Sequence, residues 1–93
     1  MARSWPPKDP NDILDYDIDW SRRLEAGETI TDADFAQAND AGITILKTSF
    51  TDSVAKVWLS GGTAGVIAEL TCTINTSAGR QMDKTVPLVI ADA

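Results

Sequence analysis

The sequence contains no histidine, and this absence excludes more chemistry than any other feature of its composition. Ser-His-Asp and Cys-His nucleophilic sites both need an imidazole base, and the usual zinc sites draw on imidazole as well. The single cysteine, Cys72, leaves no disulfide within the chain. Cys72 stands among alternating apolar residues, where a free cysteine is usually a small buried group. We therefore expect no catalytic residue and no enzyme activity.

Positive charge and long apolar runs are also scarce. Eight Lys and Arg against fourteen Asp and Glu give a formal net charge of −6 at pH 7, which argues against a nucleic-acid binder. No run approaches the roughly 18 apolar residues of a membrane span, and the first residues lack the apolar core of a signal peptide. The glycine-rich segment 61–65 lacks the lysine and following helix of a phosphate-binding loop. We expect an intracellular protein with no cofactor and no nucleic-acid or membrane partner.

The most regular pattern in the chain is an alternation of apolar and acidic residues. At 93 residues the chain is one domain, which hides only about 60–65% of the surface that its unfolded form exposes. Successive side chains of a strand point to opposite faces. One face then carries Leu14, Tyr16, Ile18 and Trp20, and the other carries Asp15, Asp17 and Asp19. The pattern predicts a half-buried first strand over residues 13–24, with Trp20 in the core.

The acidic face of this strand admits two interpretations. Carboxylate oxygens are ligands that calcium prefers, so Asp15, Asp17 and Asp19 could form a cation site. However, alternate residues on a strand stand about 7 Å apart, and the sequence lacks the glycine and distal glutamate of an EF-hand. We favour an acidic strip that faces solvent or a partner, and we expect no metal.

Further strands follow at regular spacing. Segments 43–48, 54–60 and 66–76 are rich in β-branched and apolar residues, and residues 77–80 predict a hairpin into a last strand around 82–90. Pro87 lacks a backbone donor and indicates that this strand is at an edge. Trp58 is predicted to be core. Within residues 29–42, residues 29–38 fit either a helix capped by Thr31 or an irregular strand, and we favour the strand, whereas residues 39–42 predict a turn.

These patterns predict an all-β fold: a small β-sandwich of six to seven antiparallel strands, spanning residues 13–93. Residues 1–12 have little to bury and predict an extended N-terminal docking arm, because three prolines favour extended geometry. Trp5 in this arm is either part of a disordered tail or an anchor in a neighbouring subunit. The candidate partner-binding residues in the arm are Trp5, Pro6, Pro7, Lys8, Asp9 and Pro10.

Three arginines lie at predicted strand ends or turns. Arg22 and Arg23 end the predicted first strand, and Arg80 lies at the tip of the predicted hairpin. Solvated charges are one interpretation. The other is that they bridge to acidic neighbours in an assembly, where charges affect orientation and specificity. Arg22 and Arg23 are therefore included among the candidate partner-binding residues.

Four motifs together resemble a small family of tailed-bacteriophage and prophage proteins, usually described as fiber-tail adaptors or minor head and neck proteins. The motifs are Lys8-Asp9-Pro10, Leu14 to Ser21, Val57 to Gly62, and Thr76 to Arg80. The resemblance runs from about residue 5 to residue 90, and it implies an immunoglobulin-like virion component without catalytic activity. One departure is residues 34–38, where relatives tend to have a short strand with a tryptophan and this chain has Phe35.

The resemblance leads to a functional expectation with two alternatives. We expect a virion structural protein, assembled in the host bacterial cytoplasm, that acts as an adaptor at the head–tail neck or fiber attachment site. Its partners are then other virion proteins of the neck, tail, fiber or capsid, together with further copies of itself in a symmetric assembly. The alternatives are a capsid decoration protein and a free immunoglobulin-like module that binds a host.

Overall fold

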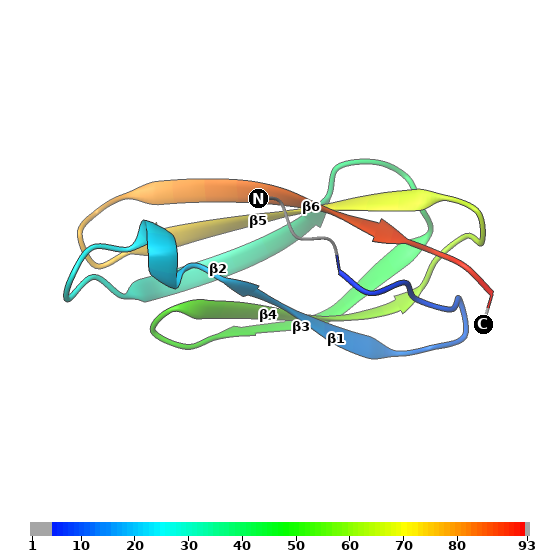
Figure 1. Cartoon of the computed structure of the whole chain (residues 1–93), viewed down its shortest axis with the longest axis horizontal. Helices are drawn as coiled ribbons and strands as arrows, with labels where there is room; N and C mark the ends of the chain where they lie inside the picture. The colour runs from blue at the N-terminus through cyan, green and yellow to red at the C-terminus, as the bar shows by residue number, and fades with distance from the viewer. Residues whose placement is uncertain (1–4, 93) are drawn as a thin grey trace.

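The computed structural model describes residues 5–92, in which six strands form two antiparallel sheets packed face to face (Figure 1). One sheet has the order β1-β4-β3 and the other β2-β5-β6. The strands are β1 (Leu14–Asp19), β2 (Ile30–Gln37), β3 (Ile43–Phe50), β4 (Val54–Gly61), β5 (Ile67–Thr76) and β6 (Gln81–Val89). These are the orders of strands B-E-D and C-F-G in an immunoglobulin domain. The predicted all-β sandwich is confirmed.

The core lies between the two sheets and follows the alternation in the sequence. In the first sheet Tyr16 pairs with Val57, and in the second Phe35 pairs with Cys72. All four side chains point inward and are buried. Burial raises the pKa of the Cys72 thiol to about 12, because a desolvated site disfavours the thiolate. Cys72 is thus the buried apolar group that the sequence predicted.

The first strand is shorter than predicted and ends at Asp19. The Asp19 carboxylate accepts a hydrogen bond from the backbone N–H of Ser21 at 2.9 Å, which turns the chain in the manner typical of aspartate. A 3₁₀ turn, η1 (Ser21–Arg23), follows. Trp20 is 1% exposed, as predicted, although it lies just beyond the strand. The extension of this strand to residue 24 was wrong.

Within the ambiguous segment 29–42, residues 30–37 form strand β2, as favoured from the sequence. Its register against β5 shifts between Ile30 and Asp32, which is the irregularity expected of a bulge. Pairing with β5 buries Phe35 and overrides the local preference of residues 31–38 for a helix.

Strand β6 is an edge strand of its sheet, as Pro87 predicted. Pro87 pairs with Glu69, on the outer face of the sheet and away from the core. Within residues 5–92, no helix has the length and hydropathy that crossing a membrane requires.

Candidate interaction site

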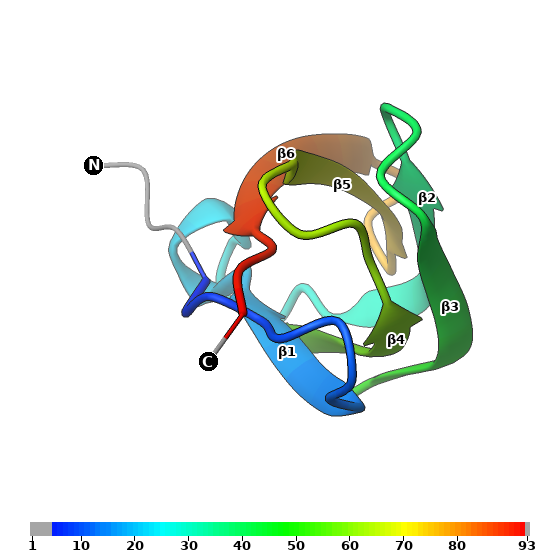
Figure 2. The ribbon, with the colours of Figure 1, turned by 90° about the vertical axis from the view of Figure 1, so that its right-hand side faces the viewer.

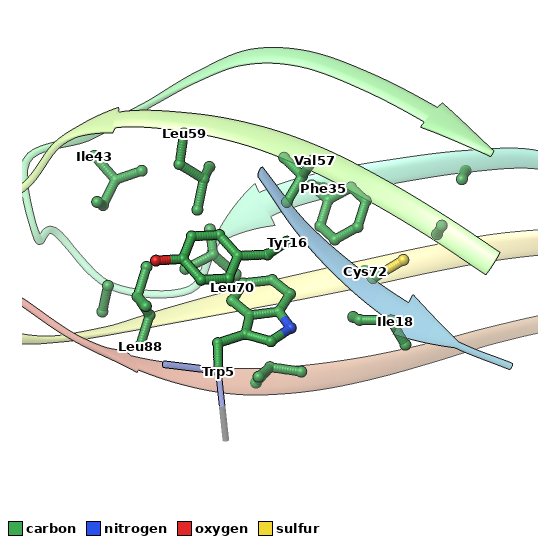
Figure 3. Close-up of a cluster of buried hydrophobic side chains, with 14 of the residues drawn as sticks. Trp5, Tyr16, Ile18, Phe35, Ile43, Val57, Leu59, Leu70, Cys72 and Leu88 are labelled. Atoms are coloured by element: carbon green, nitrogen blue, oxygen red, sulfur yellow. The ribbon is translucent and has the colours of Figure 1, made fainter. Parts of the chain in front are cut away.

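Residues 5–12, called the arm below, pack against the sandwich on the side between β1 and the end of β6 (Figures 1 and 2). The Trp5 ring stacks on Tyr16 of β1, with centroids 4.8 Å apart and planes 25° from parallel. Its indole N–H donates a hydrogen bond to the Asp17 carbonyl at 3.0 Å. Figure 3 shows Trp5 among the buried side chains of both sheets, and only 8% of its surface is exposed.

Lys8 joins the arm to the last strand. Its backbone N–H donates to the Val89 carbonyl at 2.9 Å, and its backbone carbonyl accepts from the Ala91 N–H at 3.0 Å. These two bonds form a parallel bridge between Lys8 and Ile90. The side chain is fully buried. Its ammonium donates to the carbonyls of Gly61 at 2.7 Å and Asp9 at 2.9 Å. Burial lowers the pKa of Lys8, and the nearby charges of Asp12 and Asp9 oppose this shift.

The last four residues of the arm form a tight turn that leads into β1. The Asp12 N–H donates to the Asp9 carbonyl at 3.0 Å, and the Asn11 N–H donates to the Asp9 carboxylate at 2.7 Å. Pro10 occupies the second position of this turn, where its fixed φ is favourable. The arm therefore reverses direction within four residues and lies back on its own domain.

These contacts correct one structural expectation from the sequence. The prediction that residues 5–12 form a loose arm with nothing to bury Trp5 was wrong, because β1 and β6 supply its neighbours. Residues 1–4 of the predicted arm lie outside the described residues. Pro6 and Pro7 are exposed, and Asp9 and Pro10 are half-buried. That the arm binds a partner stays a prediction.

The opposite end of the sandwich carries a second polar cluster, centred on Glu28. Its carboxylate accepts hydrogen bonds from the Arg80 guanidinium, at 2.8 Å from Nε and also from Nη2. The Thr76 hydroxyl donates to the same carboxylate at 2.5 Å. Arg80 and Thr76 hold the pKa of Glu28 down at about 2, since hydrogen bonds to the charged form favour it. Arg80 Nη2 also donates to the Arg23 carbonyl at 2.9 Å.

The candidate arginines thus have different environments. Arg23 places its guanidinium over the Trp20 ring, 5.3 Å from the centroid, and Arg80 pairs with Glu28 of its own chain. Arg22 is exposed in η1. The structure brings Arg23 and Arg80 together at one end, whereas the arm lies at the other. Partner binding by Arg22 and Arg23 stays a prediction.

The outer face of the β1-β4-β3 sheet contains the acidic strip. Lys56 of β4 pairs with Asp15 at 3.3 Å and with Asp17 at 3.6 Å. Trp58 lies on this face and not in the core, so the core prediction for Trp58 was wrong. The ammonium groups of Lys47 and Lys56 lie 4.7 Å and 5.6 Å from its ring centroid. Among the described residues, no cluster of three or more His, Cys, Asp or Glu could hold a metal ion.

Sequence reasoning missed three residues that shape these two ends. Tyr16 was assigned to the core but not recognised as the platform for Trp5. Gly61 supplies a carbonyl to Lys8 from 53 positions away, and Glu28 was not singled out from the sequence. The available signal for Glu28 was chemical: a carboxylate in a turn that could pair with the hairpin arginine, Arg80.

Comparison with known protein families finds one family model that matches most of the sequence. The family model described as "Podophage GP4 fiber-tail adaptor protein gp77" matches residues 8–89. The match begins at Lys8 and ends at Val89, two residues that share a backbone hydrogen bond. No curated protein matches the chain.

Proposed function

The chain belongs to the podophage GP4 fiber-tail adaptor protein gp77 family, and we propose that it is a rigid connector at the head–tail neck, where a fiber attaches. Membership makes it a phage structural adaptor, a component of the virion that binds tail or fiber proteins. The observation that carries this function is the family match, which covers every strand of the sandwich.

The structure supports a connecting role and not a chemical one. The chain has no histidine, and its single thiol is buried with a raised pKa. Both ends of the sandwich are fixed by hydrogen bonds between segments far apart in sequence, at Lys8–Gly61 and at Glu28–Arg80. A domain fixed at both ends holds its partners in a constant position relative to each other, as an adaptor must. We propose that it is not an enzyme.

The arm and the 3₁₀ turn are the proposed contact regions. Pro6, Pro7 and Arg22 are exposed and available to a neighbouring virion protein. In contrast, Trp5 and Lys8 are buried in their own domain, so they reach a partner only if the arm leaves it. Copies arranged in a symmetric ring would bind with avidity, because each weak contact raises the effective concentration of the next. We propose that neither a nucleic acid nor a membrane is among its partners.

Quantitative mass spectrometry of purified particles tests the adaptor function. We expect a low copy number that fits one ring per particle, measured against the major capsid protein. A copy number comparable to that of the capsid protein would indicate a decoration protein. Absence from the particle would contradict the virion role and favour a free module that binds a host.

A matched pair of variants tests the contact regions. Arg22→Glu reverses an exposed charge without altering a described contact, and Lys47→Glu reverses an exposed charge on β3 as a control, where it removes only the contact of Lys47 with Trp58. We expect Arg22→Glu to lower incorporation into particles at least several-fold and Lys47→Glu to leave it near the wild-type level. Equal incorporation of both variants would remove Arg22 from the interface.

A further inference from the structure

We propose that the arm exchanges between copies, so that Trp5 and Lys8 of one copy occupy the arm site of a neighbouring copy in the assembled adaptor. The arm site is the surface that the arm now covers on its own domain; it comprises Tyr16, Asp17, Gly61, Val89 and Ala91. Assigning the occupant to a second copy rests on the proposed adaptor function, in which several copies stand side by side. The arm site itself rests on contacts within the structure.

Every group that receives the arm belongs to the part of the chain that follows it. The Tyr16 ring and the Asp17 carbonyl receive Trp5, and the Gly61 carbonyl receives the Lys8 ammonium. A second copy presents the same groups in the same arrangement. Exchange therefore preserves each contact and changes only the connection between arm and β1, which is why swapping an identical element is a low-cost route to assembly.

The connection between arm and β1 is short and its hydrogen bonds are local. The turn at residues 9–12 is stabilised by the two bonds to Asp9, from the backbone N–H groups of Asp12 and Asn11. Opening this turn breaks these two bonds, of which the one to the Asp9 carboxylate is exposed to solvent. Four extended residues span about 13 Å, enough to carry the arm away from its own domain. Pro10 suits the opened form as well, because its φ also fits an extended chain.

The chemistry of the arm site selects a particular occupant. An entering segment must supply an indole N–H to Asp17 and an ammonium group to Gly61, with two residues between them. It must also supply a backbone that pairs in parallel with Ile90. The arm of a second copy satisfies these requirements by identity. An unrelated extended peptide would cover the Asp17 and Gly61 carbonyls without pairing them, which is costly.

Shortening the turn tests the exchange in purified full-length protein. A variant that lacks residues 10–12 cannot lay its arm back on its own domain, so its arm can fill only the arm site of another copy. We expect this variant to form a dimer or closed ring, measured by size-exclusion chromatography with light scattering. A matched control keeps the length of the turn but carries Pro10→Gly, Asn11→Ser and Asp12→Gly, and we expect it to stay monomeric under the same conditions.

Competition with a synthetic peptide identifies the contact. A peptide of residues 1–12 should dissociate the shortened variant into smaller species, and the same peptide with Trp5→Ala should not. A folded monomer, or an oligomer that the wild-type peptide leaves intact, would overturn the proposal. These results are independent of the copy number in particles, so the exchange and the adaptor function can fail separately.

A second variant tests the proposal if the shortened variant does not fold. The full chain carrying Trp5→Ala keeps its turn but lacks the ring that stacks on Tyr16, so its arm site is open to competition. The wild-type peptide of residues 1–12 should raise its melting temperature in a dose-dependent way, since a ligand of the folded state stabilises it. No shift at saturating peptide would overturn the proposal.

Discussion

The two ends of the sandwich are fixed by different interactions. At the arm end, Trp5 stacks on Tyr16 and the buried Lys8 ammonium binds backbone carbonyls. At the opposite end, the Glu28 carboxylate binds the Arg80 guanidinium. The arm end depends on apolar burial and neutral acceptors, whereas the opposite end depends on opposite charges. Because the interactions differ, the two ends should respond differently to truncation, acid and salt.

Truncating Trp5 should have the largest effect. Trp5→Ala removes a buried indole, and we expect a loss of about 3–5 kcal/mol in the free energy of unfolding. Urea denaturation followed by circular dichroism measures it. Trp5→Phe is the matched control: it keeps an aromatic ring over Tyr16 and loses the N–H donor to Asp17, so its loss should be about 1–2 kcal/mol. A loss below about 1 kcal/mol for Trp5→Ala would show that the arm is not part of the folded unit.

The location of Trp5 also shows where sequence reasoning stops. Alternation predicted the inward positions of Tyr16, Ile18 and Cys72 because each lies in a strand whose neighbours repeat with a period of two. Trp5 has no such period, and its partners come from strands that follow it in the chain. Composition indicated an exposed arm, and tertiary contacts overrode that prediction.

The prediction that Trp58 lies in the core was wrong for a different reason. Val57, Trp58 and Leu59 form a continuous apolar run, so alternation within the run does not tell which face a residue takes. Pairing with β1 decides it, because Val57 lies opposite Tyr16 and both face the core. Trp58 is then left on the outer face with Asp15. The prediction of the candidate site likewise missed residues whose role depends on contacts between distant segments, such as Glu28 and Gly61.

The next largest effect should come from breaking the charge pair at the opposite end. Arg80→Met leaves the buried Glu28 carboxylate without its main partner, and removing one member of such a pair costs more than replacing both. We expect the melting temperature to fall by roughly 5–10 °C. The double variant with Glu28→Gln should be less destabilised than the sum of the single variants. Additive losses would show that Glu28 and Arg80 do not interact.

Acid should distinguish the two ends. The folded-state pKa of Glu28, about 2, lies below the ordinary glutamate value of 4.5, so the folded state binds fewer protons in this range. Its stabilising contribution is therefore complete above about pH 4.5 and is lost as the pH falls towards 2. Melting temperatures measured across this range should fall less steeply for the Glu28→Gln variant. Trp5→Ala should keep the wild-type dependence on pH, and a flattened profile for it would contradict the separation of the ends.

Removing the buried cation should have a smaller effect than truncating Trp5 beside it. Lys8→Met keeps most of the buried chain volume and removes a charge that burial disfavours, although it leaves the Gly61 carbonyl without its donor. We expect a melting temperature within roughly 5 °C of the wild type. Because burial lowers the Lys8 pKa, wild-type stability should gain as the pH rises through that pKa to about 10.5, and Lys8→Met should lack this gain. A collapse of the fold in Lys8→Met would show that the ammonium is essential to the arm.

The smallest effect should come from the charges that lie between the ends, on the outer face of β1 and β4. Lys56 pairs with Asp15 and Asp17 at distances of 3.3 and 3.6 Å, but all three side chains are about a third exposed or more. Exposed pairs are screened by salt and add little to stability. Lys56→Ala should shift the melting temperature by less than about 3 °C at low salt, and the shift should shrink at high salt. The Arg80→Met loss should persist in that salt, because the Glu28 side chain is only 2% exposed. If salt removed both losses equally, burial would not be what separates the Glu28 end from the open face.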